Sequence, residues 1–185
     1  MPCRCKSVLC VAMFLSYGIF FVMTAPETGA HSNQAMSQSI DCRVWNSQID
    51  PAVHHESPPN PITLSDTDAL EAMNCLIKNR GNRTIAKIGG ATNLAVSQQL
   101  PEPTVELAAL YYISYIFTKS YQHADGIALW DDAGTINPPH SIESAYSAYI
   151  TWLNEVRKVG VSKARRLRLD PLNRSGLAWY GKRPS

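Results

Sequence analysis

The pattern of apolar and polar residues along the chain starts with an almost wholly apolar stretch at residues 7–23. Arg4 and Lys6 precede this stretch, and small residues follow it at 28–30. A basic start, an apolar stretch and small residues at a cleavage position are typical of an export signal. We therefore predict a signal peptide over residues 1–30, cleaved after its last residue.

The same stretch allows a second interpretation, that of an uncleaved anchor. It is just shorter than the roughly 20 apolar residues that a membrane-spanning helix needs. If it is retained, residues 7–23 would hold the protein in a membrane as an accessory to a membrane assembly.

Two later segments carry apolar residues at three- and four-residue steps, the spacing that places them on one face of a helix. The first begins at Ser65, whose hydroxyl can accept a hydrogen bond from an unpaired backbone amide, and ends before Gly81. Its apolar residues are Leu70, Met73, Leu76 and Ile77. The second begins at Ser141, which we expect to cap it, and ends at Gly160. Its apolar residues are Ile142, Ala145, Tyr146, Tyr149, Leu153 and Val156, with Trp152 beside them.

The strongest element lies between these two helices, from Val105 to about Tyr121. It is apolar on nearly every side, which is typical of a helix buried in the middle of a bundle. Tyr112 and Ile116 are four residues apart, and we expect both to be buried in the core. Residues 123–130 are expected to continue this helix or to kink near Gly126.

The carboxyl-terminal part of the chain predicts one more short helix. Ser162 begins it, with Leu167 and Leu169 expected to pack beneath. The adjacent aromatic residues Trp179 and Tyr180 lie in a stretch too short for an element of its own. We expect them to cover the core as a latch.

These elements predict an all-α fold, a small bundle of about four helices that forms one domain over residues 63–185. Residues 31–62 are polar and include four prolines between 51 and 61. Such a composition is typical of irregular structure. We therefore expect an extended arm or linker over residues 31–62, following the signal peptide.

The cysteine count predicts how this arm is held. Three of the five cysteines lie within the signal peptide, which leaves Cys42 and Cys75. A pair of cysteines in an exported chain is typical of a disulfide. We expect a Cys42–Cys75 bond that joins the arm to the first helix.

Charge is balanced over residues 31–185 but unevenly distributed. Residues 31–150 hold 6 basic and 12 acidic residues, whereas 151–185 hold 9 basic and 2 acidic ones. The overall balance gives no reason to expect nucleic acid as a partner. Four of the basic residues lie close together, namely Lys163, Arg165, Arg166 and Arg168. They form the candidate binding surface.

Two arrangements of this basic cluster can be distinguished in a structure. Most of the four side chains would be exposed and unpaired if they bind an anionic partner or a lipid surface. Several would lie within about 4 Å of carboxylates if they only complete the fold. We expect the second arrangement.

Candidate catalytic and metal-binding residues are few. Imidazole and carboxylate groups gather at His123, Asp125, Asp131, Asp132 and His140. The chain has no pair of histidines at helical spacing around a glutamate, and no serine in a Gly-x-Ser-x-Gly motif. We therefore expect a periplasmic or secreted, non-enzymatic interaction or binding module that uses no cofactor and binds another protein. A membrane would be a partner only if the anchor is retained. A metal-binding or hydrolytic enzyme built on these five residues is the alternative.

Overall fold

The computed structural model describes residues 42–53, 60–86, 100–120 and 126–182. All of them fall in one of the two units into which the chain divides, residues 37–185. The predicted signal peptide lies outside the described residues. Within the described ranges, no helix is both long enough and apolar enough to cross a membrane.

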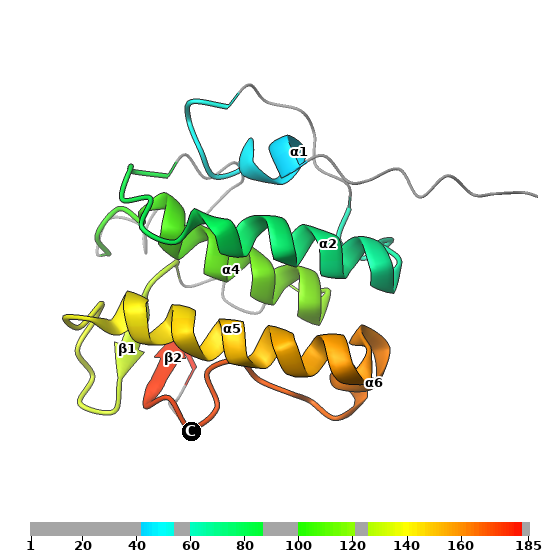
Figure 1. The fold of residues 1–185 in the computed structure, drawn as a ribbon. Coiled ribbons are helices and arrows are strands. Elements are labelled where there is room, and N and C mark those ends of the chain that lie inside the picture. Colours follow the sequence, from blue (N-terminus) through cyan, green and yellow to red (C-terminus); the bar gives the residue numbers. More distant parts are fainter. Residues whose placement is uncertain (1–41, 54–59, 87–99, 121–125, 183–185) are drawn as a thin grey trace, which may run out of the picture. The chain divides into compact units, whose positions relative to one another are not determined.

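The described part of the chain is mostly helical (Figure 1). Its elements in chain order are α1 (Cys42–Asn46), α2 (Asp66–Leu76), the 3-10 helix η1 (Ile77–Asn79), α4 (Val105–Thr118), β1 (Leu129–Asp131), α5 (Ser141–Val159), α6 (Val161–Arg166) and β2 (Leu177–Trp179). The short β1–β2 sheet corrects the expectation of an all-α fold.

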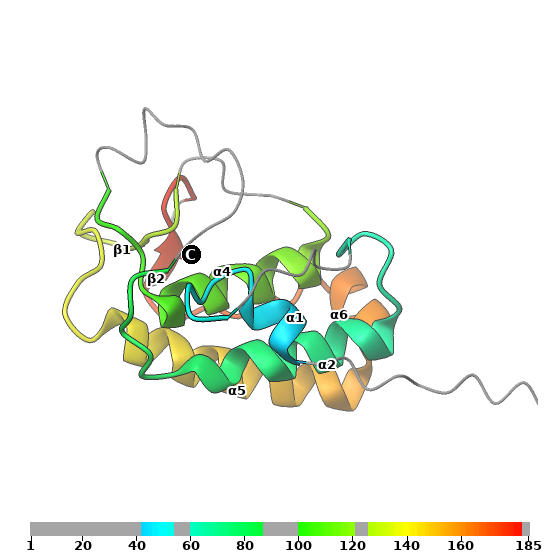
Figure 2. The same cartoon turned by 90° about the horizontal axis from the view of Figure 1, so that it is seen from above.

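Helix α4 is the centre of the core, as predicted. It packs against α2, α5 and α6, and α2, α4 and α5 lie side by side (Figures 1 and 2). Tyr112 is 6% exposed and Ile116 is fully buried. Thr104 caps the helix by accepting a hydrogen bond from the Leu107 amide at 3.4 Å. The helix ends at Thr118 because Lys119 adopts a left-handed conformation, with φ of 57°.

Helix α2 begins as the sequence predicts. The Ser65 hydroxyl accepts a hydrogen bond from the Asp68 amide at 3.1 Å. Its buried face contains Ala69, Ala72, Met73, Cys75 and Leu76, while Leu70 and Ile77 are only partly buried.

Helix α5 buries the predicted apolar residues except Ile142, which is partly buried, and ends at Gly160, but its start differs from the prediction. His140, not Ser141, is the residue before the helix, because the Ser144 amide donates to the His140 carbonyl. Ser141 therefore lies inside the first turn. Its hydroxyl is buried and has no hydrogen-bond partner among the described residues.

The β1–β2 pair differs from two expectations, that residues 123–130 continue the central helix and that Trp179 belongs to no element. Leu129 pairs with Trp179 and Asp131 with Leu177 in antiparallel register, so the described residues near 130 do not continue α4. Trp179 does lie in the core, 3% exposed, but as part of a strand. Three-residue strands contain too few positions for a two-residue alternation to be visible in the sequence.

The Cys42–Cys75 disulfide is present, with the two Cα atoms 5.2 Å apart. The arm that it holds is not extended at residues 42–46, where α1 packs against α2. Trp45 and Ile49, four residues apart, are almost fully buried in the core. The Asn79 side-chain amide also donates to Asn46 Oδ1 at 3.0 Å. This segment is therefore attached through packing as well as through the disulfide.

Candidate functional site

The basic cluster lies where α6 meets the ends of α2 and α4, and its four members differ in environment. Arg165 is the most enclosed. Its Nε donates to the Phe117 carbonyl at 2.7 Å, and a terminal nitrogen donates to the Ile116 carbonyl at 3.3 Å. The other terminal nitrogen forms an ion pair with Asp66 at 3.1 Å. Arg165 thus satisfies two of the last carbonyls of α4, which have no partner inside the helix.

The other three basic residues, Lys163, Arg166 and Arg168, are exposed. None of them has a carboxylate within 4.0 Å among the residues that the structure describes. Within the described ranges the expectation that several members pair with carboxylates is therefore wrong, because Arg165 is the one member that does so there.

The apolar residues of the same segment also differ from expectation. Leu169 packs partly against the core, but Leu167 is 56% exposed. Leu167 follows the last residue of α6, where the chain leaves the helix. An exposed leucine therefore stands between Arg166 and Arg168.

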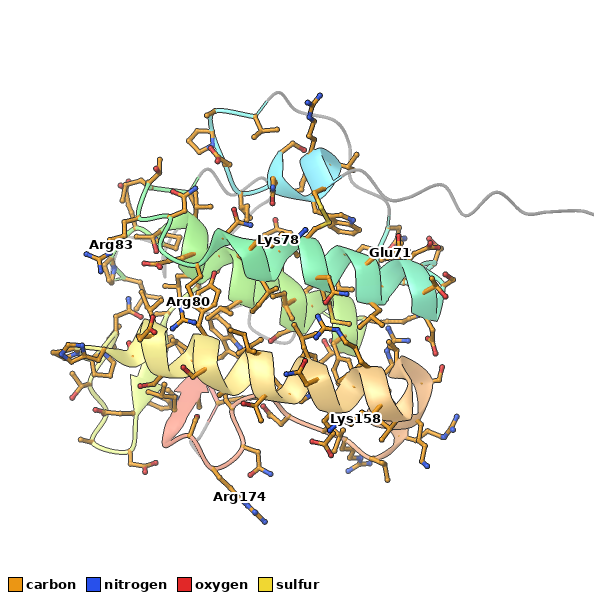
Figure 3. All side chains as sticks on the ribbon, in the orientation of Figure 1. Glu71, Lys78, Arg80, Arg83, Lys158 and Arg174 are labelled. Carbon is orange, nitrogen blue, oxygen red and sulfur yellow. A yellow bond between two sulfur atoms is a disulfide. The ribbon has the colours of Figure 1, made fainter. Side chains whose placement is uncertain are left out.

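Further exposed basic residues lie in this part of the chain. Lys158 near the end of α5 and Arg174 are exposed, and Arg174 points away from the helices (Figure 3). We call the exposed cations of this part of the chain the basic C-terminal surface. Its members are Lys158, Lys163, Arg166, Arg168 and Arg174.

A pocket of about 400 Å³ opens beside this surface. It is lined by side chains from the second half of α4, from α6 and the turn after it, and from β2 and the residue that ends the described chain. The lining residues are Ser114, Phe117, Thr118, Arg165, Arg168, Leu169, Asp170, Pro171, Trp179 and Lys182. The volume is within the range of small-molecule sites.

Three side chains form a hydrogen-bonded group at this pocket. The Ser114 and Tyr149 hydroxyl oxygens are 2.5 Å apart. Trp179 Nε1 donates to the Tyr149 oxygen at 3.0 Å and to the Ser114 oxygen at 3.3 Å. Burial raises the pKa of Tyr149 far above its ordinary value, so its hydroxyl stays protonated. Neither Tyr149 nor Trp179 can then act as a base toward Ser114, so this group of described residues does not activate the serine as a nucleophile.

Arg168 holds an unusual backbone conformation at the pocket, with φ of 53°. The Leu169 amide donates to the Ala164 carbonyl and the Arg168 amide to the Arg165 carbonyl, at 3.1 and 3.0 Å. This is the Schellman arrangement at a helix end, in which glycine usually occupies the left-handed position. An arginine there costs conformational energy that a glycine would avoid.

The alternative metal site is not assembled in the described structure. His123 and Asp125 lie outside the described residues. Asp131 Oδ1 accepts a hydrogen bond from the Thr135 amide at 2.8 Å, within a turn, while Asp132 and His140 are exposed. Among the described residues, no group of three or more metal-ligating side chains comes together.

The pocket was not foreseen in the sequence. Its hydrogen-bonded side chains come from residues 30 to 65 positions apart in the sequence, and no local spacing relates them.

Comparison of the chain with known proteins finds no matching family model, curated protein or solved structure. The function is therefore inferred from the residues and their contacts.

Proposed function

We propose that the protein is an exported, non-enzymatic binding module that attaches to an acidic protein through its basic C-terminal surface. The observation that carries this proposal is the exposure of Lys163, Arg166 and Arg168 without a carboxylate within 4.0 Å among the described residues. Export is supported by the signal-like amino terminus and by the Cys42–Cys75 disulfide, which is typical of oxidising compartments.

The arrangement of these three cations favours binding over a purely structural role. Like charges that lie close together repel one another, and none of these three cations has a carboxylate within 4.0 Å among the described residues. Carboxylates of a partner would remove it and would also accelerate association. The exposed Leu167 between Arg166 and Arg168 adds an apolar contact within the charged surface. Arginine beside apolar groups is a combination enriched in protein interfaces.

A pair of charge-matched variants tests the proposal. Lys163→Glu with Arg166→Glu reverses the charge of the surface, whereas Lys78→Glu with Arg83→Glu makes the same change in net charge elsewhere. Lys78 and Arg83 are exposed on the side of η1 (Figure 3). The probe is a glutamate-rich peptide, titrated into the full chain as exported, at low and high salt.

We expect the first variant to lose about tenfold or more of the peptide affinity, and the second to lose much less. Salt should weaken wild-type binding and have little effect on the first variant. Equal losses in both variants would show attraction by net charge alone and would overturn the proposal. Binding to vesicles of anionic lipid in preference to the peptide would overturn it in favour of a membrane surface.

A further inference from the structure

We infer that the pocket beside the basic C-terminal surface is a binding site for a carboxylate that carries an apolar body. This inference goes beyond the proposed docking on an acidic protein, because it concerns the pocket, which shares only Arg168 with the basic C-terminal surface. The pocket's volume of about 400 Å³ is that of a small-molecule site rather than of a docking surface.

The charged lining of the pocket favours an anion. Arg165, Arg168 and Lys182 line the pocket together with Asp170. Arg165 is paired with Asp66, which leaves the charge of Arg168 as the one without a described carboxylate partner. Lys182 Nζ lies 3.8 Å from Asp170 Oδ2, so that pair is loose. Arg168 has no carboxylate within 4.0 Å among the described residues. A guanidinium with free N–H groups is well suited to bind a carboxylate with two parallel hydrogen bonds.

Ser114 supplies a neutral donor, as a count of protons in its hydrogen-bonded group shows. Tyr149 is fully buried, and its oxygen accepts from Trp179 Nε1. Among the described residues, Ser114 is the one acceptor at hydrogen-bond distance for the Tyr149 proton, and a buried hydroxyl seldom leaves its proton unpaired. Ser114 then accepts, and its own proton is left for a group in the pocket that it lines.

Apolar side chains make up the rest of the lining. Phe117, Leu169, Pro171 and Trp179 provide surfaces that a bare inorganic anion would leave unused. Leu169 and Pro171 are partly exposed and offer the apolar surface, while Phe117 and Trp179, 4% and 3% exposed, border it. The combination fits a molecule with a charged end and an apolar end.

The conformation of Arg168 is a further argument. Glycine would hold the left-handed position after α6 with less strain, yet an arginine stands there with its side chain lining the pocket. Strained backbone conformations of this kind are concentrated at functional sites. The position therefore also offers a test variant, Arg168→Gly, that suits the backbone.

The experiment measures binding of 3-phenylpropanoate to the full chain as exported, by calorimetry and by the NMR signals of the tryptophan indole N–H groups. The neutral 3-phenylpropanamide and inorganic phosphate are compared with it. Arg168→Gly removes the guanidinium, and Arg166→Ala removes an exposed guanidinium from the same turn as the matched control. A short peptide ending in phenylalanine shows whether the carboxylate comes from a free acid or from the end of a protein chain.

We expect saturable binding of the acid, weakened about tenfold or more in the amide and in Arg168→Gly, and unchanged in Arg166→Ala. Arg168→Gly should keep its melting temperature or raise it, so that a loss of binding cannot be attributed to unfolding. The inference is wrong if no binding of the acid occurs up to about 10 mM. It is equally wrong if the amide or phosphate binds as well as the acid, or if Arg168→Gly binds normally. None of these outcomes bears on the docking proposal, which is tested with other variants.

Discussion

Replacement of Arg165 by methionine is expected to destabilise the protein markedly, whereas the same change at the exposed Arg166 should have little effect on stability. The Arg165 guanidinium donates to the carbonyls of Phe117 and Ile116 at the end of α4 and pairs with Asp66. It also lies over the Phe117 ring, with the guanidinium carbon 5.9 Å from the ring centroid. Methionine keeps much of the apolar stem and removes every one of these polar contacts.

The magnitude follows from the individual contacts. A hydrogen bond to a charged donor contributes about 1.5–3 kcal/mol, and the 3.3 Å bond to Ile116 should be at the lower end. The side chain of Asp66 is 43% exposed, so water screens the ion pair and its contribution is at most about 1 kcal/mol. Burying the guanidinium costs part of this gain. We therefore expect Arg165→Met to lower the free energy of unfolding by about 2–4 kcal/mol.

Urea denaturation monitored by circular dichroism measures this loss. Arg166→Met is the matched control, because Arg166 lies on the same helix and is exposed. Its effect should stay within about 0.5 kcal/mol. Arg165→Lys should fall between the two, because an ammonium group cannot reproduce the planar fork of donors. A loss in Arg165→Met no larger than that of the control would refute the conclusion that Arg165 holds the end of α4.

The remaining predictions concern the disulfide and acid stability. Cys42→Ser should lower stability by roughly 3–4 kcal/mol under oxidising conditions, because the bond closes a loop between residues 33 positions apart. Melting curves in reductant should be nearly the same for variant and wild type, and a persistent difference would contradict this origin. Hydrogen bonding by Ser162, and to a smaller extent Arg165, lowers the pKa of Asp66 below its ordinary value of 3.8. A lowered pKa stabilises the fold above the ordinary value, and this contribution is lost as the pH falls through the lowered pKa. The stability difference between wild type and Asp66→Asn should therefore be constant near neutral pH and shrink below about pH 4; a difference independent of pH down to pH 2 would argue against it.

The sequence by itself determined the helices that bury an apolar face. Residues such as Met73, Tyr149 and Val156 recur at helical spacing, and helices form where such a face can be buried. The helix start at Ser65 and the helix end at Gly160 could also be predicted, because capping interactions join residues only a few positions apart. The Cys42–Cys75 bond followed from the number of cysteines that remain after the predicted signal peptide.

Only the tertiary structure decided which groups meet across the core. Leu129 pairs with Trp179, Arg165 donates to the Phe117 carbonyl, and Ser114 is hydrogen-bonded to Tyr149, all over separations of 35 positions or more. Such contacts depend on how packed helices bring distant segments together, and they leave no local pattern in the chain. The four basic residues of the cluster around α6 could not be told apart in the sequence, because their differences depend on these distant contacts. One of them serves the fold and the others face solvent, because the side chains on a short helix point in different directions.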